Sequence, residues 1–124
     1  YSTLDQIDST STRLVVNPGG TNEKFVAERI KQAQIRVHDN NRTIFNEIIK
    51  GRADVMITDA IEVAVQAGEH SALCAAMPGK TLSFQEKGFL LPRDLMWQQF
   101  VNAWLTQRQG EGYLAEVFNR HLNK

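Results

Sequence analysis

Two acidic side chains are placed where they could act on a small molecule. Asp59 and Glu62 are three residues apart, where an apolar run ends and a helical pattern begins. A carboxylic acid held at such a junction can act as a general acid and donate a proton to a leaving group. The same spacing is typical of a capping box with Asp59 at the cap position, and on spacing alone the capping box is the stronger interpretation.

A glycine turn forms a second junction of this kind. In the segment LVVNPGGTN, residues 14–22, a β-branched run breaks at Asn17 and a helical pattern starts at Thr21. The turn would present backbone N–H groups and the positive end of a helix dipole to a carboxylate or phosphate. It also suits a plain tight turn with Thr21 as the N-cap. Ligands of open α/β sheets bind at the carboxyl ends of the strands, so we expect both junctions at one edge.

The elements that position these groups alternate between strand and helix. We predict strands at residues 13–16, 34–38, 54–58 and 72–77, and helices at residues 21–33, 41–50 and 60–67. The second helix has Asn41 as its expected N-cap and Gly51 at the position after its C-cap. A βαβαβαβ order predicts an α/β fold with right-handed crossovers and a mostly parallel sheet flanked by helices.

The pattern changes after Pro78. Residues 87–91 are expected to form one more strand, which ends at Pro92, and two amphipathic helices follow, separated by Gly110 and Gly112. We therefore divide the chain into an α/β lobe, residues 1–86, and a return strand with two C-terminal helices, residues 87–124. The apolar faces of the two helices consist of Trp97, Phe100, Val101, Trp104 and Leu105, and of Leu114, Val117, Phe118, His121 and Leu122.

Composition narrows the classes of partner. The chain has 14 basic and 14 acidic residues in a scattered pattern, which argues against a nucleic-acid interface. No apolar run approaches the roughly 20 residues of a membrane span, so membrane insertion is not expected. Cys74 is the only cysteine and lies in an apolar run, where we expect a buried small side chain.

Other polar side chains are expected to be structural. The three histidines, His38, His70 and His121, lack the spacing of metal ligands, so no metal site is predicted. A basic group around Gly51 is expected to be a solvated helix end, and it consists of Arg42, Lys50 and Arg52.

The order of elements and several short motifs resemble a known family. The phrases NPGGTNE, HDNNRTIF, GRADVMITDAIE, LC and KGFLLPRD are similar to the second lobe of type II periplasmic solute-binding proteins. Residues 13–84 resemble lobe two, and residues 87–121 resemble the segment that returns to lobe one. Within the family, the motifs most resemble the cyclohexadienyl dehydratases, which convert prephenate or arogenate to phenylpyruvate or phenylalanine. The resemblance implies a periplasmic location, and the first half of lobe one has no counterpart in the chain.

The resemblance also implies roles for individual residues. Asn17 and Glu62 match catalytic positions of the dehydratases, and Asp59 matches the carboxylate that pairs with a ligand ammonium group. The turn that grips the ligand carboxylate matches Gly20, Thr21 and Asn22. The reaction needs a proton donor for the departing hydroxyl, and the resemblance implies no metal or organic cofactor.

We therefore expect a truncated domain similar to cyclohexadienyl dehydratase. It would bind a small carboxylate such as prephenate or arogenate and catalyse its decarboxylative dehydration. One alternative is an amino-acid or organic-acid binding module without catalysis. Another is an interaction domain that self-associates, and a homodimer through the C-terminal helices is expected because their apolar faces need cover.

Overall fold

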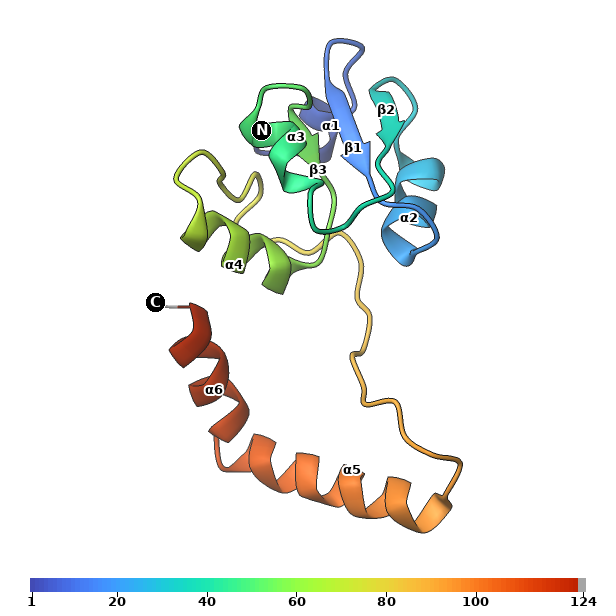
Figure 1. The fold of residues 1–124 in the computed structure, drawn as a ribbon, viewed down its shortest axis with the longest axis vertical. Helices are drawn as coiled ribbons and strands as arrows, with labels where there is room; N and C mark the ends of the chain where they lie inside the picture. The colour runs from blue at the N-terminus through green and yellow to red at the C-terminus, as the bar shows by residue number, and fades with distance from the viewer. Residues whose placement is uncertain (123–124) are drawn as a thin grey trace. The chain divides into compact units, whose positions relative to one another are not determined.

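The computed structural model describes residues 1–122 of the chain and divides into two compact units (Figure 1). The first unit is Tyr1–Thr81, and the second begins at Leu82. Residues 123 and 124, the end of the predicted C-terminal region, lie outside the described residues. The candidate site residues named from the sequence all belong to the first unit.

The first unit is built on a parallel sheet, as the sequence predicts. Its three strands are β1 (Arg13–Val16), β2 (Gln34–Val37) and β3 (Val55–Met56), in the order β2-β1-β3. The register pairs Leu14 of β1 with Ile35 and with Val55. The central strand β1 is a continuous β-branched and aliphatic run because both of its faces are buried.

Helices flank this sheet (Figure 1), and they are α1 (Leu4–Ile7), α2 (Thr21–Arg29), α3 (Phe45–Ile49) and α4 (Ala60–Glu69). On one face of the sheet, Val15 packs in a cluster with Ile44 and Ala53. Side chains alternate along a strand, so Leu14 and Val16 face the other way, and both are fully buried.

Helix α1 is an element that the sequence reading missed. The side chain of Thr3 accepts a hydrogen bond from the backbone N–H of Gln6 at 3.3 Å, and Ile7 is only 1% exposed. A signal for it was present, since threonine followed three residues later by glutamine is the pattern of a capping box. The polar lead-in therefore contributes a core side chain.

The predicted end of α2 is wrong, and one carboxylate explains the difference. The helix ends at Arg29 instead of residue 33. The carboxylate of Asp8 accepts hydrogen bonds from the backbone N–H groups of Lys31, Gln32 and Ala33 at 2.6–2.9 Å. A side chain that takes these three donors competes with helical hydrogen bonding, so the chain leaves the helix and turns into β2.

Helix α3 is shorter than predicted, and Asn41 is not its N-cap. The backbone N–H of Arg42 donates to the side chain of Asn40 at 2.9 Å, and Thr43 donates to the Asn40 carbonyl at 3.0 Å. These bonds close a turn before the helix, which is a usual role of asparagine. At the other end the prediction is confirmed: Lys50 is the C-cap, and Gly51 follows with φ +67°.

A buried carboxylate attaches α3 to the strands. Glu47 is 7% exposed and forms ion pairs with Arg36 of β2 and with Arg52. Arg52 is solvent-exposed, as predicted for a basic helix end, but it is also an ion-pair partner of Glu47, which the prediction did not include. The hydrogen bond from Arg52, together with that from Arg36, lowers the pKa of Glu47 to about 2.

Two predicted strands are absent from the described residues. Residues 72–77 form turns and irregular chain, and residues 87–91 are irregular with Leu90 fully exposed. A strand needs a neighbouring backbone to satisfy its N–H and C=O groups, and β3 offers an edge of only two residues. Cys74 is exposed in this irregular segment, so its expected burial is also wrong.

The second unit contains the two predicted amphipathic helices, α5 (Leu95–Gly110) and α6 (Tyr113–Leu122). Asp94 caps α5 by accepting from the N–H groups of Met96 and Trp97. The helices contact each other, and Gly112 makes the turn between them with φ +74°. No helix within residues 1–122 is long and apolar enough to span a membrane.

Candidate functional site

The two junctions lie at one edge of the sheet, as predicted. β1 and β3 are parallel neighbours, so their carboxyl ends point the same way. Asn17 follows β1 directly, and the chain after β3 leads through Thr58 and Asp59 into α4. We refer to this region, from Asn17 to Asn22 and from Thr58 to Glu62, as the carboxyl edge.

The glycine turn leaves the start of α2 without a side-chain cap. Gly19 has φ +79°, a conformation that favours glycine, while Gly20 is extended and occupies the N-cap position. The interpretation of Thr21 as the N-cap is wrong, because Thr21 is the first helical residue and is exposed. Within the described structure no side chain caps α2, so the first-turn N–H groups of Thr21 and Asn22 suit an incoming anion.

Glu23 is a residue of this turn that the sequence reading overlooked. Its Oε2 accepts a hydrogen bond from the backbone N–H of Gly19 at 2.7 Å. Glu23 is the third residue of α2, the position from which a capping-box glutamate reaches back. The bond holds the turn in its left-handed conformation.

Asn17 has a side-chain oxygen that is buried and lacks a partner. Its Oδ1 makes no hydrogen bond among the described residues, although the residue as a whole is only half-buried. A buried acceptor without a donor costs free energy, which is a feature expected of a site that a ligand completes. An N–H or O–H group of a ligand would satisfy it.

The Asp59–Glu62 pair does not form the capping box that its spacing suggests. Asp59 does occupy the N-cap position of α4, but its side chain does not cap the helix. The carboxylate of Glu62 instead accepts a hydrogen bond from the hydroxyl of Thr58. Thr58 was not singled out from the sequence, since a threonine before a helix has many ordinary roles.

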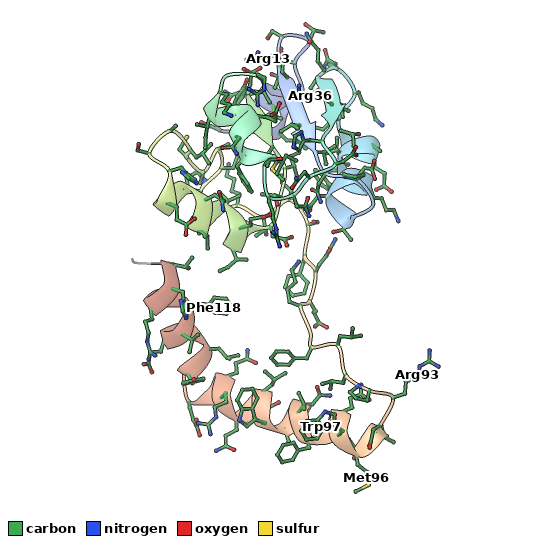
Figure 2. All side chains as sticks on the ribbon, in the orientation of Figure 1. Arg13, Arg36, Arg93, Met96, Trp97 and Phe118 are labelled. Atoms are coloured by element: carbon green, nitrogen blue, oxygen red, sulfur yellow. The ribbon has the colours of Figure 1, made fainter. Side chains whose placement is uncertain are left out.

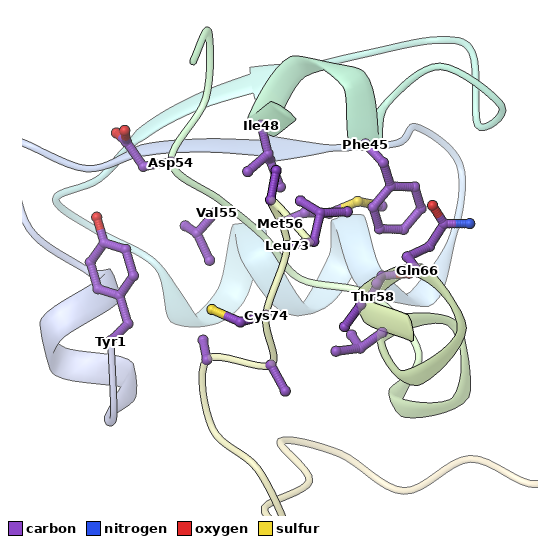
Figure 3. A pocket seen from close by; sticks show the side chains of 15 residues that line it. Tyr1, Phe45, Ile48, Asp54, Val55, Met56, Thr58, Gln66, Leu73 and Cys74 are labelled. Atoms are coloured by element: carbon purple, nitrogen blue, oxygen red, sulfur yellow. The ribbon is translucent and has the colours of Figure 1, made fainter. Parts of the chain in front are cut away.

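An apolar pocket of about 220 Å³ lies along β3 in the same unit. Figure 3 shows Val55 and Met56 of β3 beside Leu73 and Cys74 from the irregular segment. Of the residues at the carboxyl edge, Thr58 is the one that also lines this pocket. No residue of the glycine turn lines this pocket, so the two features are distinct.

The histidines do not form a metal centre in the part of the chain that the structure describes. No group of three or more His, Cys, Asp and Glu side chains there could hold a metal ion. His38 follows β2 and shares a hydrogen bond of 2.8 Å with the Thr43 hydroxyl. His70 is the C-cap residue of α4, and His121 lies in α6.

Comparisons with known proteins agree with this architecture. No protein-family model matches the chain. A cyclohexadienyl dehydratase of Pseudomonas aeruginosa is 46% identical over 122 residues, which are 98% of this chain and 46% of that protein. The crystal structure of an ancestral cyclohexadienyl dehydratase is 40% identical, with a TM-score of 0.64, and the match covers 100% of this chain and 52% of the other.

An ancestral cationic amino acid solute-binding protein shares the fold, with 24% identity and a TM-score of 0.67 over 98% of this chain and 52% of the other. The fold is therefore that of a type II periplasmic solute-binding protein, in the form of an α/β lobe with two C-terminal helices. Within that class, the chain is similar to the cyclohexadienyl dehydratases over nearly its whole length. It spans about half the length of the relatives that it matches.

Proposed function

We propose that the carboxyl edge binds a small carboxylate such as prephenate or arogenate and that Glu62 promotes its decarboxylative dehydration. The observation that carries the proposal is the unpartnered buried Oδ1 of Asn17, which directly follows β1, the strand next to the one that leads to Glu62. Similarity to cyclohexadienyl dehydratases over nearly the whole chain supports the same reaction.

Binding would begin at the glycine turn. The N–H groups of Thr21 and Asn22, at the positive end of α2, would donate hydrogen bonds to the ligand carboxylate. Asp59 would attract an ammonium group, which arogenate carries and prephenate does not. The Asn17 oxygen would accept a hydrogen bond from the ligand and so fix its orientation.

Glu62 would then act as the general acid. Its proton passes to the ring hydroxyl, the carbon–oxygen bond breaks, and water leaves. The bond between the ring and its carboxylate breaks at the same time, carbon dioxide leaves, and the released electron pair completes the aromatic ring. Each turnover leaves Glu62 as a carboxylate that must regain a proton from solvent.

The test is turnover of prephenate and arogenate by the 124-residue chain and by its Glu62→Gln variant. Glutamine keeps the shape of the side chain and removes the transferable proton, so activity should fall by about a hundredfold or more. Calorimetry should show the same ligand affinity for both proteins. Equal turnover by Glu62→Gln would remove Glu62 from the mechanism, and binding by an inactive parent chain would favour the second candidate.

The second candidate is an amino-acid or organic-acid binding module without catalysis. It is favoured by Asp59, an acidic residue at the start of α4, at the same edge of the sheet as a turn suited to a carboxylate. Such a pair would hold both charges of an amino acid. A thermal shift with amino acids, together with no turnover of either cyclohexadienyl acid, would support this candidate.

We also propose that the chain works in the periplasm, as the family resemblance implies, and that it self-associates through the second unit. Large apolar side chains of α5 are exposed, among them Phe100, at 62%, and Trp97, at 47%. Figure 2 shows Trp97 and Phe118 on the two helices. Burying such a side chain is worth about 1.5–3 kcal/mol, which favours pairing with a second copy.

A further inference from the structure

The hydroxyl of Thr58 makes a contact that the proposed reaction has not yet used. Thr58 Oγ1 donates a hydrogen bond to Oε2 of Glu62, and both side chains are partly buried. Thr58 lies just before the N-cap residue of α4, and Glu62 is the third residue of that helix. The bond therefore joins the chain that follows β3 to the first turn of α4.

This bond restricts the orientation of the Glu62 carboxylate. A glutamate in the first turn of a helix ordinarily rotates about three side-chain bonds and points to solvent. Donation to Oε2 holds the carboxylate plane and leaves Oε1 as the oxygen that can carry a proton to another molecule. The two oxygens of Glu62 thus become inequivalent.

Thr58 is itself held in place. As a β-branched residue it has few side-chain rotamers, and it lines the apolar pocket together with Met56 of β3 and Val63 of α4. Serine keeps the hydroxyl without the methyl group, and valine keeps the shape without the hydroxyl.

We propose that Thr58 is a positioning residue that directs Oε1 of Glu62 toward the departing hydroxyl of the ligand. The inference rests on the proposed function of Glu62. In the reaction, Oε1 gives its proton to the leaving oxygen, and the electron pair of the broken O–H bond stays on Glu62. The Thr58 hydroxyl continues to donate to Oε2, so it also stabilises the negative charge that forms on the carboxylate as the proton leaves.

The first test compares Thr58→Val and Thr58→Ser with the parent chain in turnover of prephenate and arogenate. Thr58→Val should lower kcat by about tenfold while KM stays within about twofold, because positioning acts on the proton transfer and not on binding. Thr58→Ser should restore most of kcat. A matched control is Thr106→Val, which removes a hydroxyl that donates to the Asn102 carbonyl at 3.0 Å in α5 and should leave kcat unchanged.

A second readout does not depend on activity. In NMR spectra, the two γ-methylene protons of Glu62 should have separate shifts in the parent chain and in Thr58→Ser, and averaged shifts in Thr58→Val. Identical Glu62 signals in the parent chain and Thr58→Val would overturn the positioning role. If the parent chain turns over neither substrate, the proposed function fails, and the methylene signals still decide whether Thr58 fixes Glu62.

Discussion

Acidic side chains in the first unit fall into two groups by their partners. The carboxylate of Asp8 accepts hydrogen bonds from three backbone N–H groups, and the bond from Gln32 has the largest effect in lowering its pKa. The carboxylate of Asp54 accepts hydrogen bonds from Arg13, which lower the pKa of Asp54. Glu47 lies between two arginines. Each of these three carboxylates has its hydrogen-bond or ion-pair partners within the first unit, and these contacts stabilise the folded chain. The carboxylate of Glu62, in contrast, accepts a hydrogen bond from the Thr58 hydroxyl and forms no ion pair within the described residues. It lies at the carboxyl edge, which suits a side chain that acts on a ligand.

The Glu47 network predicts how stability depends on acid. The pKa of the Glu47 carboxyl is lowered from 4.5 to about 2 in the folded state. At pH values between these two, the folded state therefore binds fewer protons than the unfolded state. The stabilising contribution of this carboxyl is therefore complete above the ordinary pKa and is lost as the pH falls toward 2. The melting temperature of the parent chain should fall across this window, and Glu47→Gln should melt lower at neutral pH with a flatter acid dependence.

Glu69→Gln is the matched control, because Glu69 is exposed at the end of α4. It should retain the steep acid dependence of the parent chain, measured by circular dichroism. A Glu47→Gln profile that parallels the parent profile would show that the two arginines do not stabilise the folded state through this carboxylate.

Local sequence patterns predicted the three strands of the sheet and most of the helices, but they also predicted two strands that are absent from the described residues. β1 could be predicted because its β-branched run needs burial on both faces. The early end of α2 could not be predicted from local patterns, because it depends on Asp8, which is over 20 residues away in sequence. The unpartnered oxygen of Asn17 and the Thr58–Glu62 bond are also tertiary features that no spacing reveals.

The two glycines of the turn offer a matched pair of substitutions. Gly19 has φ +79°, and Gly20 is extended at φ −121°, while an added methyl group would meet nothing within 4 Å at either position. Gly19→Ala should therefore lower the unfolding free energy by about 1 kcal/mol through backbone strain alone. Gly20→Ala should change it by less than about 0.5 kcal/mol. Urea unfolding measures both, and equal losses would contradict the assigned turn.

At the scale of the whole molecule, the two units differ in how they bury their apolar side chains. The first unit has fully buried residues such as Leu14, Val15 and Ile44. The helices of the second unit have no fully buried side chain within the described residues, and Trp97 stacks on Phe100 with ring centroids 5.5 Å apart. The second unit therefore has apolar surface available to a partner.

Self-association is the corresponding prediction. Sedimentation at micromolar concentration should show a dimer of the 124-residue chain. Phe100→Ser should shift it toward monomer, because it removes an aromatic side chain from the exposed face of α5, whereas Asn102→Ser should not. A monomer in which Trp97 and Trp104 are shielded from quenchers would contradict the prediction. It would show that the apolar faces of the helices pack against other residues of the same chain.

The central claim is that the carboxyl edge binds a carboxylate ligand, and an NMR titration tests it most directly. Prephenate and arogenate are added separately to the ¹⁵N-labelled chain, with acetate as the control for simple anion binding. We expect shifts at the backbone amides of Thr21 and Asn22 and at the Asn17 side-chain amide. The affinity should be millimolar, about 4 kcal/mol of binding free energy, because the described edge contacts one side of the ligand. Shifts confined to the pocket beside β3, or no shifts with either ligand at millimolar concentration, would contradict it.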